Sequence, residues 1–304
     1  MNFSPQYTRL TTSRRRILIE LGAATALGNS MSGSAQAQNP PVQNASGVKV
    51  EKDVVVGKAG DTELHCDIYR PPPGTEKRMA LIHFHGGAFA VGSKNELAPK
   101  VTPFAARGYV SVAAQYRLGA ASQWPSQIED AKLHIRWVRE HADALGINPK
   151  HIGLAGYSAG GYIAVYTAGQ PDAGVAACIA SYPAPEVTRG VMPPGSDDAA
   201  VKATSTYTQI DEGYPPTVIY HGLADTTIPP ENSQRLLQTL RDAKVPCELH
   251  TFAGVPHEFD AHPEFAEACA AITDFFLDRE VLNPRTYPPF GPGGGRGRGR
   301  GPGQ

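Results

Sequence analysis

The serine of the motif GYSAGG at residues 156–161 is the strongest candidate for a nucleophile in this 304-residue sequence. An apolar run at 152–155 precedes the motif, and an expected helix at 159–169 begins inside it. A serine on a tight strand-to-helix turn projects its hydroxyl, and glycines two positions to either side let strand and helix approach closely. We therefore predict that Ser158 is a nucleophile; the alternative is a turn of small residues without chemistry.

Two further side chains follow expected strands in the order that such a serine requires. Asp225 and then His257 each come just after an apolar run, where the catalytic groups of parallel sheets lie. Asp225 is the predicted acid, and His257 is the predicted base because it combines this position with the required order. Glu258 and Asp260 are rival acids, but they are too near His257 in the sequence to orient its ring easily.

A glycine pair completes the predicted site. The sequence HFHGGA at 83–88 ends another apolar run, and its glycines allow backbone N–H groups to point at the serine. We predict that the N–H groups of Gly86, Gly87 and Ala159 form an oxyanion hole and that His85 holds this loop in shape. These residues could perform two-step acyl transfer without a metal or an organic cofactor.

The elements that must position these residues alternate between short apolar runs and longer amphipathic segments. This alternation predicts one α/β domain, with a mostly parallel, eight-stranded sheet and helices on both faces. The first two strands are expected to form an antiparallel edge joined by a turn at 57–61, and residues 181–216 to form an irregular segment, at most a small lid or pocket wall. The predicted strands are 48–56, 62–69, 79–84, 109–114, 151–155, 175–180, 217–220 and 248–252, and the predicted helices are 126–141, 159–169, 231–243 and 263–279.

Both ends of the chain differ from this body. Paired arginines, a mildly apolar stretch and the sequence Ala35-Gln36-Ala37 predict an export signal over residues 1–37, of the twin-arginine type. A basic leader and a short membrane anchor are the alternatives. Residues 38–290 would be the catalytic domain, without a membrane span and located in the bacterial periplasm or outside the cell. The Gly/Arg-rich residues 291–304 are predicted to be disordered.

Composition excludes several other functions. The net charge is -1 and the basic residues of the body are scattered, so no nucleic-acid-binding surface is expected. The four cysteines have no metal-ligand spacing, and three of them fall in expected strands or directly beside one, where a buried free thiol is the more common state. They are Cys66, Cys178, Cys247 and Cys269.

Several motifs together resemble those of a known family. They recur in order over about residues 80–260 and comprise HGGAF at 85–89, YRL at 116–118, WP at 124–125 with IED at 128–130, GYSAGG at 156–161, HG at 221–222 with Asp225, and HEF at 257–259. This set resembles the acetyl-esterase/lipase group of α/β hydrolases, which includes hormone-sensitive-lipase-like esterases and feruloyl- or acetylxylan-esterase-like carbohydrate esterases. The resemblance implies the α/β-hydrolase fold and hydrolysis of carboxylic esters by the residues named above.

Two departures from the family pattern refine this expectation. Hormone-sensitive-lipase relatives usually read HGGG and GDSAGG and carry an N-terminal helical cap, whereas this chain has Ala88 and Tyr157 and begins its first strand early. The nearly capless carbohydrate esterases fit better, so short acyl groups on a small molecule or a carbohydrate are the expected substrates. An amide-cleaving hydrolase, such as an arylformamidase or a peptidase-like enzyme, and a catalytically silent binding protein are the alternatives.

Overall fold

A computed structural model describes residues 42–43, 47–119 and 122–288. The predicted export signal and the predicted disordered tail lie outside these residues. Within the described part, one sheet has strand order β1-β2-β3-β5-β4-β6-β7-β8-β9. The strands are β1 (Val42–Gln43), β2 (Lys49–Ala59), β3 (Thr62–Arg70), β4 (Ala80–Phe84), β5 (Val110–Ala114), β6 (Ile152–Tyr157), β7 (Ala177–Ser181), β8 (Thr217–Gly222) and β9 (Cys247–Phe252).

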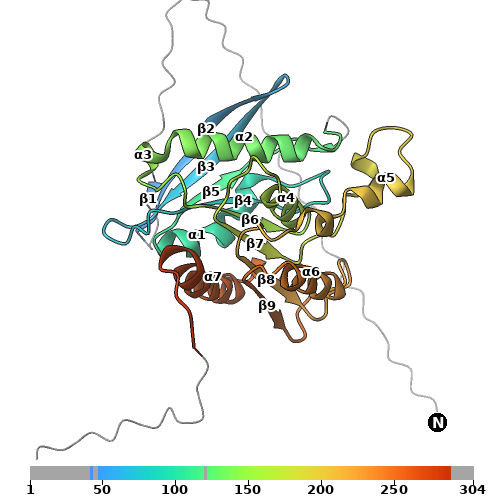
Figure 1. The fold of residues 1–304 in the computed structure, drawn as a ribbon. Coiled ribbons are helices and arrows are strands. Elements are labelled where there is room, and N and C mark those ends of the chain that lie inside the picture. Colours follow the sequence, from blue (N-terminus) through green and yellow to red (C-terminus); the bar gives the residue numbers. More distant parts are fainter. Residues whose placement is uncertain (1–41, 44–46, 120–121, 289–304) are drawn as a thin grey trace, which may run out of the picture. The chain divides into compact units, whose positions relative to one another are not determined.

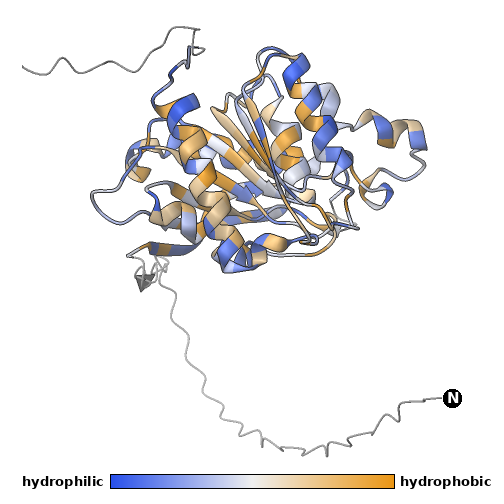
Figure 2. Cartoon of the chain, turned by 90° about the horizontal axis from the view of Figure 1, so that it is seen from below, coloured by the Kyte–Doolittle hydropathy of each residue, from blue (hydrophilic) through white to orange (hydrophobic). Residues whose placement is uncertain are grey.

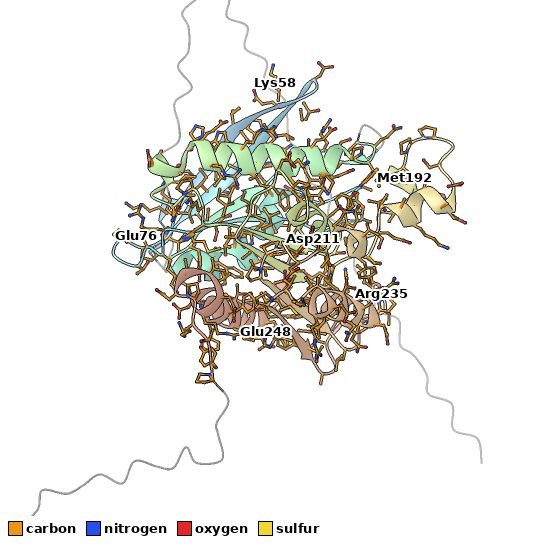
Figure 3. The ribbon with its side chains drawn as sticks, viewed as in Figure 1. Lys58, Glu76, Met192, Asp211, Arg235 and Glu248 are labelled. Carbon is orange, nitrogen blue, oxygen red and sulfur yellow. The ribbon has the colours of Figure 1, made fainter. Side chains whose placement is uncertain are left out.

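The eight predicted strands are all present, and the two-residue β1 is the ninth. From β5 to β9 every neighbouring pair is parallel, while β1, β2 and β3 form an antiparallel edge. The turn of the β2–β3 hairpin was predicted too long, because residues 57–59 belong to β2. Only Gly60, with φ 61°, and Asp61 lie between the two strands. Lys58 lies near the tip of this hairpin (Figure 3).

Helices cover both faces of the sheet (Figure 1). Side chains of α2, α4 and α6 share one apolar core with one face, and side chains of α1 and α7 share a second core with the other face. In Figure 2 the strands at the centre are mostly apolar, and the outward sides of the helices are hydrophilic. The bounds are α1 (Ala98–Ala106), α2 (Ser126–Glu140), α3 (Ala142–Leu145), α4 (Ala159–Ala168), α5 (Asp198–Ala203), α6 (Glu231–Asp242) and α7 (Pro263–Leu277).

The helix α1 is absent from the sequence-based prediction. Its sequence, APKVTPFAA, has prolines at 99 and 103, which normally argue against a helix. Pro99 occupies the first turn, where no N–H is needed, and the buried side chains of Val101 and Phe104 hold the helix against the sheet. Tertiary packing therefore overrides the local signal here.

The segment 181–216 is less irregular than predicted. It contains η3 (Arg189–Val191), α5 and η4 (Thr206–Gln209), and α5, which buries none of its residues, projects away from the sheet (Figure 1). Met192 lies on this projecting part (Figure 3). Thr204 and Val191 tie the segment to the domain, because Tyr162 Oη donates to the Thr204 carbonyl at 2.9 Å and the Trp124 N–H to the Val191 carbonyl at 2.7 Å.

The four cysteines carry free thiols. Three are buried and Cys247 is half-buried. Within the described residues, no group of three or more His, Cys, Asp and Glu side chains is arranged to hold a metal ion. Among the described helices, none has both the length and the apolarity needed to cross a membrane.

Candidate active site

Ser158 occupies the sharp turn between β6 and α4. Its backbone has φ 57° and ψ −116°, a conformation that is rare for any residue except glycine. Such a conformation costs about 1–3 kcal/mol and persists only where the surroundings enforce it. The turn leaves the serine 9% exposed, at the carboxyl ends of the parallel strands.

The glycines of the motif are required by close packing around this turn. A Cβ on Gly156 would lie 2.0 Å from the carbonyl oxygen of Gly160, and a Cβ on Gly160 would lie 2.0 Å from that of Phe84. No side chain fits at either position without moving α4 away from β4 and β6. The glycines therefore set the depth at which α4 approaches the sheet and with it the position of Ser158.

The structure brings the three predicted side chains together from three separate loops. His257 Nε2 lies 2.9 Å from Ser158 Oγ, and His257 Nδ1 lies 2.6 Å from Asp225 Oδ2. Because a carboxylate only accepts, Nδ1 carries the proton of the neutral ring and Nε2 is free to accept the serine proton. This is the arrangement that a general base and its orienting acid require.

Asp225 is held ready for this role by its own loop. Its Oδ1 accepts the N–H groups of Thr227 at 2.8 Å and Ile228 at 3.0 Å, so Oδ2 faces His257. Burial by itself would raise the pKa of this carboxyl, but the hydrogen bonds from His257, Ile228 and Thr227 outweigh burial and lower the pKa. Asp225 is consequently ionised at neutral pH.

Sequence reasoning missed a second histidine on the same carboxylate. His221 Nε2 donates to the Ile228 carbonyl at 2.9 Å and lies 3.2 Å from Asp225 Oδ2, while its Nδ1 accepts from the Ser233 hydroxyl at 2.6 Å. Burial lowers the pKa of His221, so its ring stays neutral and adds no charge beside the acid. Its position at the end of β8 was visible in the sequence, but its partners were not.

The predicted oxyanion loop faces the serine. A Cβ on Gly86 would lie 3.2 Å from Ser158 Cβ, and Gly87 has φ 108° with the Val91 carbonyl so close that only glycine fits. Within the described residues the N–H groups of Gly86, Gly87 and Ala159 have no hydrogen-bond acceptor. These are the three donors expected from the sequence, and they remain available to an oxygen bound beside Ser158.

His85 braces this loop from behind. Its Nδ1 lies 2.7 Å from the Gly86 carbonyl, and its ring stacks on Tyr116 at 4.4 Å between centroids. Tyr116 Oη also donates to the His85 carbonyl at 2.9 Å, and Arg117 pairs with the buried Asp130 at 2.7 Å. The YRL and IED motifs thus support the loop and do not reach Ser158 themselves.

Neither rival acid contacts His257. Asp260 is buried and pairs with Tyr182 and Lys100, and Glu258 is exposed on a residue with φ 58°. The ring of Tyr182, by contrast, meets the ring of His257 at 4.6 Å between centroids and 62° between planes. Tyr182, Lys100 and Asp260 are a further group that the sequence did not reveal.

A hollow of about 540 Å³ lies far from these residues, at the amino ends of the strands, where Lys77, Arg78 and His151 line it. Ligands of such sheets bind at the opposite, carboxyl ends. We therefore place the candidate site at the carboxyl ends of the strands, around Ser158, and not at this hollow.

Known proteins similar to this chain are ester hydrolases. The BD-FAE family profile matches residues 66–175. The probable carboxylic ester hydrolase LipM of Mycobacterium tuberculosis is 28% identical over 261 residues, which are 74% of this chain and 60% of LipM. Carboxylesterase NlhH of the same organism is 32% identical over 114 residues, which are 37% of this chain and 36% of NlhH. The chain thus spans about 60% of LipM and a smaller part of NlhH.

Similarity to solved structures extends over a whole protein. The native structure of esterase Est2 from the planctomycete Thermogutta terrifontis is 31% identical, with a TM-score of 0.67 over 79% of this chain and 95% of Est2. Other structures of Est2 are butyrate-bound, propionate-bound or phosphorylated by paraoxon.

Proposed function

Because the chain belongs to the acetyl-esterase/lipase group of α/β hydrolases, we propose that it is a serine carboxylic ester hydrolase acting on short-chain acyl esters. The observation that carries this proposal is the hydrogen-bonded series from Ser158 Oγ through His257 to Asp225. Ester hydrolysis needs a nucleophile, a base and a stabiliser of negative oxygen, and in this proposal Ser158, His257 and the oxyanion loop take these roles.

In the proposed reaction, His257 Nε2 takes the Ser158 proton while Oγ attacks the ester carbonyl. The carbonyl oxygen becomes negative and accepts hydrogen bonds from the N–H groups of Gly86, Gly87 and Ala159. The imidazolium then gives its proton to the leaving alcohol, which departs and leaves an acyl group on Oγ. Water, deprotonated by His257, attacks the acyl group and releases the carboxylic acid and Ser158.

One comparison favours short acyl groups. Est2, which is similar over nearly its whole length, binds butyrate and propionate. An acetyl or feruloyl group projecting from a carbohydrate is the substrate that we propose within this class.

The purified protein should hydrolyse p-nitrophenyl acetate and butyrate faster than the octanoate. Ser158→Ala should lower kcat by about 10³-fold or more, since a nucleophile's loss removes the covalent route. Ser196→Ala, which changes a serine of the 181–216 segment, is the matched control and should retain activity. Paraoxon treatment followed by peptide mass spectrometry should modify Ser158.

Unchanged hydrolysis by Ser158→Ala would reject the mechanism. Acetylated xylan, methyl ferulate and N-formylkynurenine complete the substrate panel. Cleavage of the formamide in preference to every ester would replace the ester proposal with an amide hydrolase, and inertness toward all of them would indicate a binding protein.

We also propose that the enzyme acts in the periplasm or outside a bacterial cell, because residues 1–37 have the three parts of an export signal. Mass spectrometry of the protein from the periplasm should find Gln38 at or near the amino terminus. An intact Met1 in all of the active protein would reject export.

A further inference from the structure

A buried polar cluster lies behind the base, on the side of His257 away from the solvent. It consists of Lys100 on α1, Tyr182 just after β7, and Asp260 in η5 (Phe259–Ala261). Tyr182 Oη lies 2.6 Å from Asp260 Oδ1, and Lys100 Nζ lies 2.8 Å from the same oxygen and 2.9 Å from Tyr182 Oη. Tyr182 is fully buried and Asp260 is 2% exposed, while the Lys100 side chain, at 12% exposed, reaches the cluster from its rim.

The direction of each hydrogen bond follows from the charges. Burial, aided by the nearby Asp260 carboxylate, raises the pKa of Tyr182 well above its usual value, so the phenol keeps its proton. It therefore donates to Asp260, and the Lys100 ammonium donates to both oxygens. The ammonium also lies 4.5 Å from the centre of the Tyr157 ring, a cation–π contact. Tyr157 is the residue at which this chain departs from GDSAGG, and here it helps to enclose the lysine.

The phenol ring is fixed at both ends. Its hydroxyl is held by the cluster. At the other end, the Tyr182 N–H donates to the Tyr220 carbonyl at 2.7 Å, and the Tyr182 backbone has φ 38°. The ring edge between these anchors meets the ring of His257. Asp260 follows His257 by only three residues, so the same contacts tie the loop that carries the base to α1 and β7.

We infer that Tyr182, clamped by Lys100 and Asp260, is a positioning residue that holds the His257 imidazole in its hydrogen bonds to Ser158 and Asp225. This inference rests on the proposed function. Residues 253, 254 and 256 of the same loop are exposed, whereas the ring of the buried Tyr182 meets the His257 ring from the interior. A small error in the position of a catalytic group can lower the rate by about 100-fold.

Two variants of Tyr182 test the inference. Tyr182→Phe keeps the ring but frees it from the cluster, and it should lower kcat by about 3- to 10-fold with an unchanged KM, as expected for misplacement of a base. Tyr182→Leu removes the ring and should lower kcat by about 100-fold.

The chain offers a matched control at the opposite end of the sheet. Tyr109 Oη donates to Asp274 Oδ1 at 2.8 Å, and Asp274 pairs with Lys77, so this cluster has the same chemistry without a neighbouring base. Tyr109→Phe removes a phenol donor from a carboxylate in the same way and should leave kcat unchanged.

A double variant separates positioning from folding. Lys100→Met with Asp260→Leu replaces the ion pair by apolar residues, a change that is often neutral or stabilising for the pair itself. The Tyr182 hydroxyl loses both of its partners and with them its fixed position. The folded double variant should therefore lose kcat by about as much as Tyr182→Phe. In each affected variant, the strongly deshielded proton between His257 Nδ1 and Asp225 should broaden in the proton NMR spectrum, and it should stay sharp in Tyr109→Phe.

Wild-type kcat in Tyr182→Phe and in the double variant, measured on folded protein, would overturn the inference. The inference would also be overturned if kcat fell as much in Tyr109→Phe as in Tyr182→Phe. Ser158→Ala is assayed alongside: activity that survives this change defeats the proposed function itself, whereas serine-dependent activity that is indifferent to Tyr182 defeats only the positioning role.

Discussion

Asp225 shows how one carboxylate can serve two purposes, because Oδ1 is held by its own loop and Oδ2 orients His257. In Asp225→Asn the amide can present an N–H where the carboxylate accepted one, which favours the wrong tautomer of the ring. We expect kcat to fall by about 10³- to 10⁴-fold, as removal of such an acid does elsewhere.

Steady-state kinetics of Asp225→Asn would check this expectation, with Asp211→Asn, an exposed aspartate, as the control. A loss of less than tenfold in Asp225→Asn would mean that another acid orients the ring. Asp260 is the nearest alternative in the sequence, but its contacts with Lys100 and Tyr182 assign it elsewhere.

The sequence allows Ser158, Asp225 and His257 to be predicted because each follows an apolar strand in a fixed order. Contacts between residues far apart leave no such local sign. Tyr182 meets Asp260 78 residues later in the chain, and Lys100 meets Tyr182 across 82 residues. For the same reason Ser233 could not be recognised as the partner of His221.

At the level of elements, the approach of α4 to β4 governs the site. Gly160→Ala would place a methyl group 2.0 Å from the Phe84 carbonyl oxygen, so helix and strand must separate. We expect a loss of about 1–3 kcal/mol in unfolding free energy and a fall in kcat, because Ser158 and the oxyanion loop lie on the two elements that move apart.

Urea unfolding and steady-state kinetics of Gly160→Ala would measure both effects. Gly190→Ala is the control, since a Cβ there meets its nearest atom only at 4.0 Å. Equal stability and activity in the two variants would show that α4 accommodates the methyl group.

The same elements show where prediction from sequence succeeds and fails. Helices α2, α4, α6 and α7 were located within a few residues. The helix α4 buries nine of its ten residues and has no single apolar stripe, so the strand and the serine motif before it gave its position. The prolines of α1 concealed a helix that the sheet stabilises, and the short helices of 181–216 depend on contacts such as that of Tyr162 with Thr204. The local sequence pattern thus identifies helices that local preferences favour, and it misses those that depend on tertiary contacts.

For the whole molecule, buried neutral histidines set the response to acid. Burial lowers the pKa of His83 to about 3 and that of His134 to about 4, against 6.5 in an unfolded chain. Above pH 6.5 both are neutral in either state, so stability is unaffected. Below pH 6.5 the unfolded chain binds protons at these histidines and the folded chain does not. Each histidine should therefore lower the unfolding free energy by about 2 kcal/mol at pH 5.

Unfolding free energies at pH 7 and pH 5 would test this decline. In the wild type, Tyr157 Oη lies 3.3 Å from His83 Nδ1. The His83→Gln variant keeps a polar partner for this hydroxyl and has no titrating group at this position. The variant should lose about 2 kcal/mol less than the wild type between the two pH values. An equal decline in both proteins would show that His83 does not contribute.

The sheet order described above separates the reacting groups by their distance from its edge. Ser158 follows β6 in the interior of the sheet, whereas His257 follows β9, the outermost strand, which is paired only with β8 in the described sheet and is mostly half-buried. Edge strands open in local fluctuations that leave the interior of a sheet intact. Amides of β9 should therefore exchange with deuterium faster than those of β6, and warming should remove the base from the nucleophile before the core melts. The temperature at which activity is lost would then report the local opening of β9. Activity would return on cooling as long as the other strands had remained paired.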